Sequence, residues 1–199
     1  MTKFIFDLDG TITKNETLPI IASYFNIQKD IENLTKDTVK GNIPFVESFI
    51  RRVYILGQLP VNEISNLLEQ VELHPHLLKF INENQSNCVI ATGNLDCWIN
   101  LLAKRICCTC FCSEGIIENN NVKKIQKILK KENIVKHFKN ENEKVVYIGD
   151  GNNDIEAMRL ADISIASGLT HMPSGGVLSV ADYLILNERA LCRQLNQLL

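Results

Sequence analysis

The sequence has no long apolar run and no excess of positive charge. Nothing in its 199 residues approaches the roughly 18 consecutive apolar residues that a membrane-spanning helix requires. Acids interrupt the only early apolar run, within residues 1–13, so the amino terminus does not resemble a secretory signal peptide. A formal net charge of −2 supplies no basic surface for nucleic acid. We therefore expect a cytoplasmic protein without a membrane or nucleic-acid partner.

Disulfide and zinc-site patterns are also missing, although the chain has seven cysteines. An odd number of cysteines in a cytoplasmic protein argues against a disulfide framework. Cys107 and Cys110 have metal-site spacing, but no second such pair and no pair of histidines completes four ligands. In a strand, Cys108, Cys110 and Cys112 would share one face. We interpret them as small buried hydrophobic residues rather than as a metal or redox site.

Short apolar runs separated by helical patterns dominate the rest of the chain, which has 45% hydrophobic and 22% charged residues and no internal repeat. Alternation of strands and helices over this length predicts an α/β fold with a doubly wound, parallel, Rossmann-like sheet. The predicted strands are Lys3–Leu8, Cys88–Thr92, Cys108–Cys112, Lys144–Ile148 and Ile163–Ala166.

One segment, residues 15–76, shows only helical periodicity. We call it the insert, and we predict a small helical domain here, with residues 1–14 and 77–199 forming the core. Its two apolar stripes are Phe45, Phe49, Val53 and Leu56, and Val61, Ile64, Leu67 and Leu68. After residue 116, Asn119–Asn121 predicts a loop or small hairpin. The spacing of Ile125, Ile128 and Leu129 then predicts a helix that begins near Lys123.

Polar residues follow three of the predicted strands. Ligands bind such sheets beyond the carboxyl ends of the strands, so these side chains are expected to meet. They are Asp7 and Asp9 after the first strand, Thr92, Gly93 and Asn94 after the second, and Asp150, Gly151, Asn153 and Asp154 in "GDGNND". Four converging carboxylates would repel one another unless a cation lies among them, and ligands made only of oxygen favour Mg²⁺. The Thr92 hydroxyl and the adjacent N–H groups suit a phosphate. A phosphate beside such a metal centre suggests phosphoryl transfer through an aspartyl-phosphate.

A dianionic substrate beside acids also requires a fixed positive charge. Lys123 and Lys124 are candidates, because a lysine in the first turn of a helix is unfavourable for the helix dipole and so indicates another purpose. We favour Lys123, which is nearest the loop. Lys130 and Lys131 would lie at the far end of that helix and are less favoured.

These motifs resemble those of the haloacid dehalogenase superfamily of phosphotransferases. "DLDGT" is similar to its first motif, Thr92 in "IATGN" to its second, a lysine at a helix start to its third, and "GDGNND" to its fourth. The resemblance covers nearly the whole chain and implies that the insert is the superfamily's mobile helical cap. Within the superfamily, the phosphoserine phosphatase family is the most similar. It has a glutamate where this chain has Glu16, and a cap helix like "FVESFIRRV", which supplies Arg52.

The resemblance implies Mg²⁺-dependent hydrolysis of a small phosphorylated metabolite, with O-phosphoserine as the expected substrate. Asp7 would attack phosphorus, Asp9 would protonate the leaving oxygen and then activate water, and Glu16 and Arg52 would bind the ammonium and carboxylate groups. The expected metal residues are Asp7, Asp9, Asp150 and Asp154, with Asp9 acting through its backbone carbonyl and Asp154 supporting the metal shell. The expected phosphate-binding or substrate-binding residues are Thr92, Gly93, Asn94, Asn153 and Lys123.

Three positions depart from the family pattern: Gly10 replaces a serine, Asn94 a glycine and Lys124 a glycine. A phosphatase or mutase for another small phosphorylated metabolite is therefore an alternative. A signalling receiver domain is a second, although its phosphorylated aspartate lies alone on a later strand. A dehalogenase has no use for an acid at Asp9. Both a monomer and a homodimer are compatible with the sequence.

Overall fold

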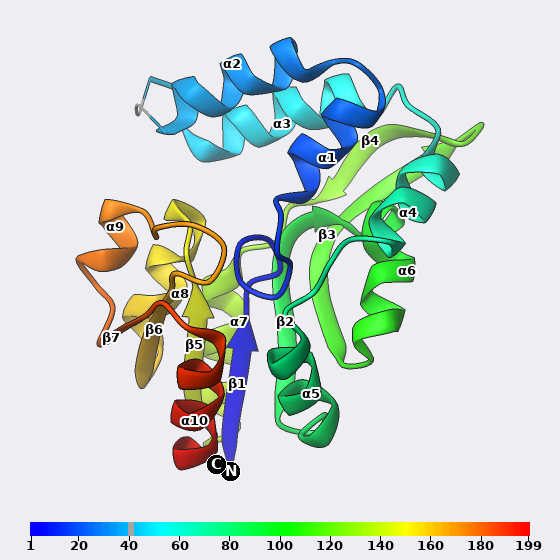
Figure 1. The fold of residues 1–199 in the computed structure, drawn as a ribbon. Coiled ribbons are helices and arrows are strands. Elements are labelled where there is room, and N and C mark those ends of the chain that lie inside the picture. Colours follow the sequence, from blue (N-terminus) through cyan, green and yellow to red (C-terminus); the bar gives the residue numbers. More distant parts are fainter. Residues whose placement is uncertain (40–41) are drawn as a thin grey trace.

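A computed structural model describes residues 1–39 and 42–199, with the backbone alone for residues 30, 35, 36, 38, 39 and 45. Its centre is a seven-stranded sheet in the order β4-β3-β2-β1-β5-β6-β7 (Figure 1). All neighbouring strands are parallel except β3 and β4. The strands are β1 (Thr2–Phe6), β2 (Cys88–Leu95), β3 (Thr109–Glu118), β4 (Asn121–Lys127), β5 (Lys144–Gly149), β6 (Ile163–Ser167) and β7 (Tyr183–Ile185).

Helices cover both faces of this sheet. Side chains alternate between faces along each strand, so Phe4 and Phe6 join one apolar cluster and Ile5 joins the other. The first cluster includes α5 (Pro75–Glu83), α6 (Asp96–Ile106) and α10 (Glu188–Leu198). The second includes α7 (Lys131–Asn140), α8 (Ile155–Leu160) and α9 (Gly175–Leu178). The predicted doubly wound α/β fold is confirmed, and each of the five predicted strands overlaps an observed one.

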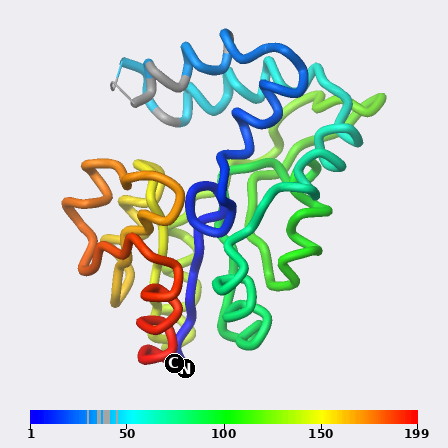
Figure 2. Tube along the Cα trace, viewed as in Figure 1, coloured from blue at the N-terminus to red at the C-terminus, as the bar shows by residue number. Residues whose placement is uncertain are grey.

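The chain between β1 and α5 is helical, as the periodicity predicts. It contains α1 (Thr17–Tyr24), α2 (Gln28–Val39), α3 (Phe45–Leu56) and α4 (Val61–Glu69). α1 rises from the carboxyl end of β1, and α2 and α3 lie beyond that end of the sheet (Figures 1 and 2). α4 instead packs beside α6. In the predicted stripes Phe49, Val53 and Leu56 are buried, whereas the side chain of Phe45 lies outside the described residues.

The prediction of a helix that begins near Lys123 is wrong. Residues 121–127 form β4, which pairs antiparallel with β3 across the predicted hairpin. Asn119 and Asn120 have φ values of 51° and 64°, as a tight hairpin turn requires. Two irregularities in the pairing interrupt the alternation of side chains. The spacing of Ile125, Ile128 and Leu129 that suggested a helix crosses an element boundary, because Ile125 lies in β4 and the other two residues lie between β4 and α7.

Three of the four clustered cysteines pack against the interior of the protein, whereas Cys107 is exposed. Cys108, Cys110 and Cys112 are partly buried, and they pack against the first apolar cluster. Within the described part of the chain, no cysteine belongs to a group of three or more side chains spaced to hold a metal ion. These contacts support interpreting the cysteines as small hydrophobic residues. Among the described residues, no helix has the length and apolar character needed to cross a membrane.

Candidate active site

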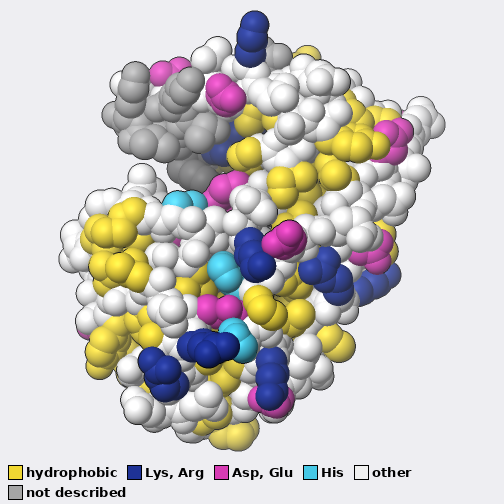
Figure 3. Space-filling model, viewed as in Figure 1, with side chains coloured by type: hydrophobic (Ala, Val, Ile, Leu, Met, Phe, Trp, Pro, Cys, Tyr) yellow, Lys and Arg dark blue, Asp and Glu magenta, His cyan; other side chains and the backbone are white. Residues whose placement is uncertain are grey.

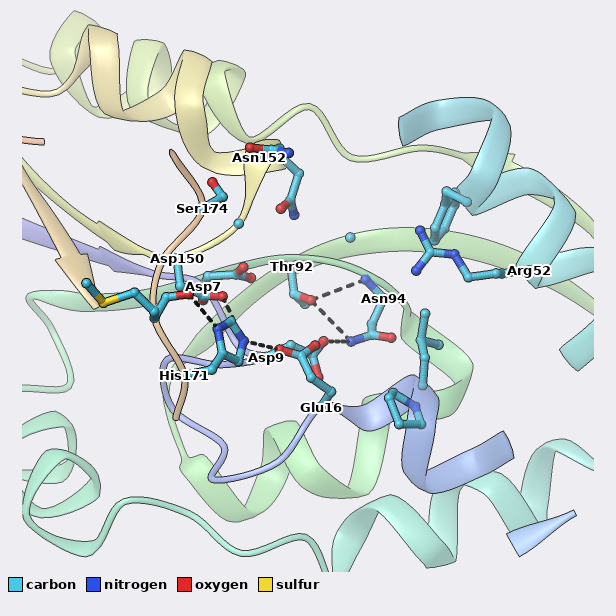
Figure 4. A pocket seen from close by; sticks show the side chains of 17 residues that line it. Asp7, Asp9, Glu16, Arg52, Thr92, Asn94, Asp150, Asn152, His171 and Ser174 are labelled. Atoms are coloured by element: carbon cyan, nitrogen blue, oxygen red, sulfur yellow. Dashed lines mark hydrogen bonds and ion pairs between the residues drawn. The ribbon is translucent and has the colours of Figure 1, made fainter. Parts of the chain in front are cut away.

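Most of the predicted site residues line one pocket, at the carboxyl ends of β1, β2 and β5. The strand order reverses at β1, which has β2 on one side and β5 on the other, so a crevice forms there. The cavity measures about 460 Å³ and is lined by residues of the core and of α1 and α3. Figure 3 shows a hollow in the surface of the molecule on this side. The lining of the cavity includes Asp7, Asp9, Glu16, Arg52, Thr92, Gly93, Asn94, Asp150 and Asn153 (Figure 4).

The floor of the site is a buried ion-pair network. The Lys131 ammonium lies 2.7 Å from Asp7 Oδ1 and 2.7 Å from Asp154 Oδ1. The Lys131 side chain is only 3% exposed. Burial lowers the pKa of Lys131, but Asp154 and Asp7 outweigh that effect and raise it, so the ammonium stays charged. The backbone N–H of Leu8 also donates to Asp7 Oδ1 at 2.7 Å, which fixes the Asp7 carboxylate against the lysine.

Lys131, and not Lys123, therefore supplies the positive charge at Asp7. Lys123 lies on β4, where it is exposed and pairs with Glu118 at 2.6 Å. Lys124 lies on the same strand and is exposed. The expectation that the functional lysine opens a helix is met by α7, because Lys131 is the first residue of this helix, which follows the β3–β4 hairpin. Because β4 was predicted to be the start of a helix, the predicted lysine lies eight residues before the observed one.

Asp154 accepts four hydrogen bonds that connect the parts of this network. Its Oδ1 accepts hydrogen bonds from Lys131 Nζ and Tyr147 Oη, both at 2.7 Å. Its Oδ2 accepts from the backbone N–H groups of Asp150 and Gly151, both at 3.0 Å. The Asp154 carboxylate thereby fixes the Lys131 ammonium and the loop that carries Asp150.

Asp150 lies above this network, where Thr11 Oγ1 donates to its Oδ1 at 3.0 Å. Burial, followed by the charge of Asp154, raises the pKa of Asp150 to about 7. The same two causes raise the pKa of Asp7 well above its usual range, against the lowering effect of Lys131. One lysine therefore does not offset the buried acids, and a bound cation would favour their ionised forms.

The donor set fits Mg²⁺. Asp7, Asp150 and Asp154 each offer one carboxylate oxygen, and these three atoms lie within 4.8 Å of one another. Carboxylate oxygens are ligands that Mg²⁺ accepts, and no sulfur or imidazole belongs to this group.

Asp9 is held on the pocket wall by two donors. The backbone N–H of Thr17, the first residue of α1, donates to Asp9 Oδ1 at 2.7 Å. Asn94 Nδ2 donates to Asp9 Oδ2 at 2.6 Å. Burial and the charge of Glu16 raise the pKa of Asp9 to about 6, despite these hydrogen bonds. A carboxyl with this pKa exchanges a proton readily near neutral pH.

Glu16 and Arg52 lie at the outer part of the pocket (Figure 4). The Glu16 Oε1 atom lies 2.8 Å from His171 Nε2. His171 also approaches Asp150, with its Nε2 at 3.4 Å from Asp150 Oδ2. The hydrogen bond to Glu16, the largest cause, raises the pKa of His171 to about 9. Burial lowers the pKa of Arg52, whereas the charges of Glu16 and Asp9 oppose that effect.

Gly10 has a structural reason to be glycine. Its φ is +69°, and a Cβ atom built on it would lie 2.6 Å from Asp150 Oδ2. Replacing Gly10 with serine, the residue of the phosphoserine phosphatase pattern, is expected to lower Tm by at least about 2 °C, because the left-handed conformation alone costs about 1–2 kcal/mol. Activity should fall as well, since Asp150 has to move. Thermal unfolding and a phosphatase assay measure both effects.

Gly175 provides the matched control for this substitution. It has open space around its Cβ position, so Gly175→Ser should behave as the wild-type protein. A Gly10→Ser variant with unchanged Tm and activity would contradict the assigned packing against Asp150.

Sequence reasoning missed several contributors to the site. His171, Met172 and Ser174 line the pocket from the loop between β6 and α9, which carries no recognisable pattern. Tyr147 lies within a strand, where its hydroxyl is indistinguishable in sequence from an ordinary buried aromatic residue. Thr17 contributes a backbone N–H, which no residue type specifies.

Comparison with known proteins shows which family this chain resembles. The family model of haloacid dehalogenase-like hydrolases matches residues 2–162. A phosphoserine phosphatase of Methanocaldococcus jannaschii is 24% identical over 175 residues, which cover 81% of this chain and 83% of that protein. Phosphoserine phosphatase SerB2 of Mycobacterium tuberculosis is 27% identical over 175 residues, but this chain spans only 43% of its length.

Solved structures show the same fold. A phosphoserine phosphatase with a phospho-aspartyl intermediate analogue superposes with a TM-score of 0.81 at 21% identity, covering 98% of this chain and 99% of that one. A phosphoserine phosphohydrolase-like protein from Francisella tularensis gives a TM-score of 0.81 at 21% identity, with coverages of 98% and 99%. Together with the family match, the predicted resemblance is confirmed: this chain belongs to the haloacid dehalogenase-like hydrolases.

Proposed function

We propose that this hydrolase is a Mg²⁺-dependent phosphatase that converts O-phosphoserine to serine and phosphate through an aspartyl-phosphate on Asp7. The observation that carries the proposal is the buried contact of Asp7 with Lys131, with Asp9 beside it and with Glu16 and Arg52 in the same pocket. The names of the relatives support the choice of substrate.

Asp7 is the proposed nucleophile. Its carboxylate attacks phosphorus, a bond forms between an Asp7 oxygen and phosphorus, and the bond from phosphorus to the serine oxygen breaks. Lys131, Thr92, Gly93 and Asn153 hold the phosphoryl oxygens. The carboxylates of Asp7 and Asp150 and the backbone carbonyl of Asp9 would hold Mg²⁺, which would neutralise charge on the nucleophile and the phosphoryl group.

Asp9 is the proposed acid and base. In the protonated form it gives its proton to the serine oxygen as the ester bond breaks. The resulting carboxylate then takes a proton from water, which attacks the aspartyl-phosphate and releases phosphate. Thr17 and Asn94, which hold the two oxygens of Asp9, keep it directed to the pocket. Because Thr17 begins α1, Asp9 is connected to the start of the insert, which we propose acts as a cap that excludes water.

Arg52 is the proposed partner of the substrate carboxylate, and its removal provides the test of substrate class. Arg52→Ala is expected to lower kcat/KM for O-phosphoserine about 10- to 100-fold, because a hydrogen bond between charged groups contributes about 1.5–3 kcal/mol. O-phosphoethanolamine has the ammonium but no carboxylate, so its kcat/KM should fall much less. Steady-state phosphate release measures both values.

Arg51 is a matched control, because it is an exposed neighbour that pairs with Glu47 at 2.5 Å. Arg51→Ala should leave both kcat/KM values close to those of the wild-type enzyme. Equal losses for the two esters in Arg52→Ala, or no loss for either, would contradict the assigned role and favour a phosphatase or mutase for another small metabolite.

A further inference from the structure

His171 contacts the proposed substrate-recognition residue from a distant part of the chain. It lies in the loop between β6 and α9, whereas Glu16 immediately precedes α1. The two residues are 155 positions apart in sequence, and their side chains meet at 2.8 Å. Both side chains are partly exposed, at 44% for His171 and 40% for Glu16. Both line the pocket, so the contact is part of its wall.

The surroundings of the imidazole define its role as a donor. His171 Nδ1 faces the backbone carbonyl oxygen of Met172 at 3.1 Å. Its Nε2 faces carboxylate oxygens of Glu16 at 2.8 Å and Asp150 at 3.4 Å. These partners are acceptors only, so each ring nitrogen satisfies its contact by donating a hydrogen. The ring is thereby fixed by a backbone group on one side and presents an N–H to Glu16 on the other.

Glu16 has a competing attraction on the far side of the pocket. Both residues line the same pocket, and the charge of Glu16 opposes the lowering of the Arg52 pKa that burial causes. Figure 4 shows Arg52 across the pocket from His171. A substrate that carries an ammonium and a carboxylate needs Glu16 and Arg52 as separate partners. A Glu16 carboxylate drawn to the guanidinium would block both positions.

We propose that His171 is a positioning residue that determines selectivity for the substrate ammonium by acting through Glu16. The imidazole holds Glu16 Oε1 on the core side of the pocket, and Oε2 remains directed to the ammonium while Arg52 receives the carboxylate. This inference rests on the proposed function, because the ammonium belongs to the proposed substrate. It adds the β6–α9 loop to the elements that select the substrate.

The test compares O-phosphoserine with 3-phosphooxypropanoate, an ester that keeps the carboxylate and lacks the ammonium. His171→Ala is expected to lower the ratio of the two kcat/KM values about tenfold, equivalent to about 1.4 kcal/mol. The change should come mainly through KM for O-phosphoserine. His171→Gln, whose amide can donate to Glu16 from a similar position, should restore most of the ratio.

A double-mutant comparison tests the route through Glu16. Glu16→Gln should lower the same ratio, and adding His171→Ala to that variant should lower it little further. His137 is the control, since it is exposed on α7 and forms an ion pair with Glu141, the residue that follows this helix. His137→Ala should keep the wild-type ratio. Thermal unfolding of every variant separates a folding defect from a change in selectivity.

The outcomes distinguish the inference from the proposed function. If the wild-type enzyme hydrolyses both esters equally well, the proposed substrate is wrong and the inference falls with it. If the wild-type enzyme prefers O-phosphoserine and His171→Ala keeps that preference, only the inference is overturned. An equal loss for both esters in His171→Ala also overturns it, because His171 would then support the site as a whole rather than ammonium selectivity.

Discussion

Replacing Asp7 with asparagine is expected to lower kcat by at least about 10⁴-fold, as removal of a catalytic nucleophile does in other hydrolases. The substitution keeps the shape of the side chain but removes the charge needed to attack phosphorus. It also removes the carboxylate that pairs with Lys131 at 2.7 Å. Steady-state phosphate release from O-phosphoserine, with Mg²⁺ present, measures the loss.

Asp162→Asn is the matched control for this substitution. The Asp162 carboxylate accepts hydrogen bonds from Lys139 and from the backbone N–H of Val145, near the amino end of β5 and therefore at the opposite end of the sheet from the pocket. This variant should lose stability without a comparable loss of kcat. Substantial turnover by a folded Asp7→Asn protein would exclude Asp7 as the nucleophile.

Replacing Lys131 with methionine has the second largest expected effect, and it acts on both activity and stability. Activity should fall by about 10²–10³-fold, because a preorganised positive group no longer faces the phosphoryl oxygens. The substitution also leaves Asp7 and Asp154 without their shared cation. Breaking a buried pair by removing one partner costs about 3–5 kcal/mol, so metal-free protein should unfold at a lower denaturant concentration.

Lys123→Met is the decisive companion variant. Lys123 is exposed and pairs with Glu118, and surface pairs contribute only about 0–1 kcal/mol. Activity and stability should therefore stay close to wild type. If Lys123→Met inactivates the enzyme and Lys131→Met does not, the lysine assigned from the structure is wrong.

The strand ends were predictable because parallel sheets impose a simple rule. Apolar runs show where β1, β2 and β5 lie, and the polar residues that follow them have to meet at one edge. Asp7, Asp9, Thr92 and Asp150 were found in this way, and the structure places all four around the pocket. The prediction that these residues meet required only their positions at the strand ends, and no knowledge of side-chain packing.

Lys131 was not predicted as the functional lysine because irregular pairing made the sequence of β4 resemble that of a helix. The two pairing shifts between β3 and β4 removed the strict alternation by which strands are recognised. The helix therefore appeared to begin near Lys123, and Lys131 was assigned to its far end. Once the hairpin is located, the same argument about a lysine at a helix start selects Lys131.

The contacts around Asp9 and Glu16 depend on tertiary structure alone. Asn94 marked a departure from the family pattern, but its hydrogen bond to Asp9 depends on how the end of β2 lies against the start of α1. His171 reaches Glu16 from a loop without a motif. Local sequence specifies neither approach, because each joins segments that only the complete fold brings together.

The most direct test of the account is to trap the phosphorylated enzyme. The protein is mixed with O-phosphoserine and Mg²⁺, quenched in acid, digested and analysed by mass spectrometry. The account predicts that the peptide containing Asp7 gains the mass of one phosphoryl group, and that the gain is lost in Asp7→Asn. Turnover of O-phosphoserine with no such gain on Asp7, or with the gain on another residue, would contradict it.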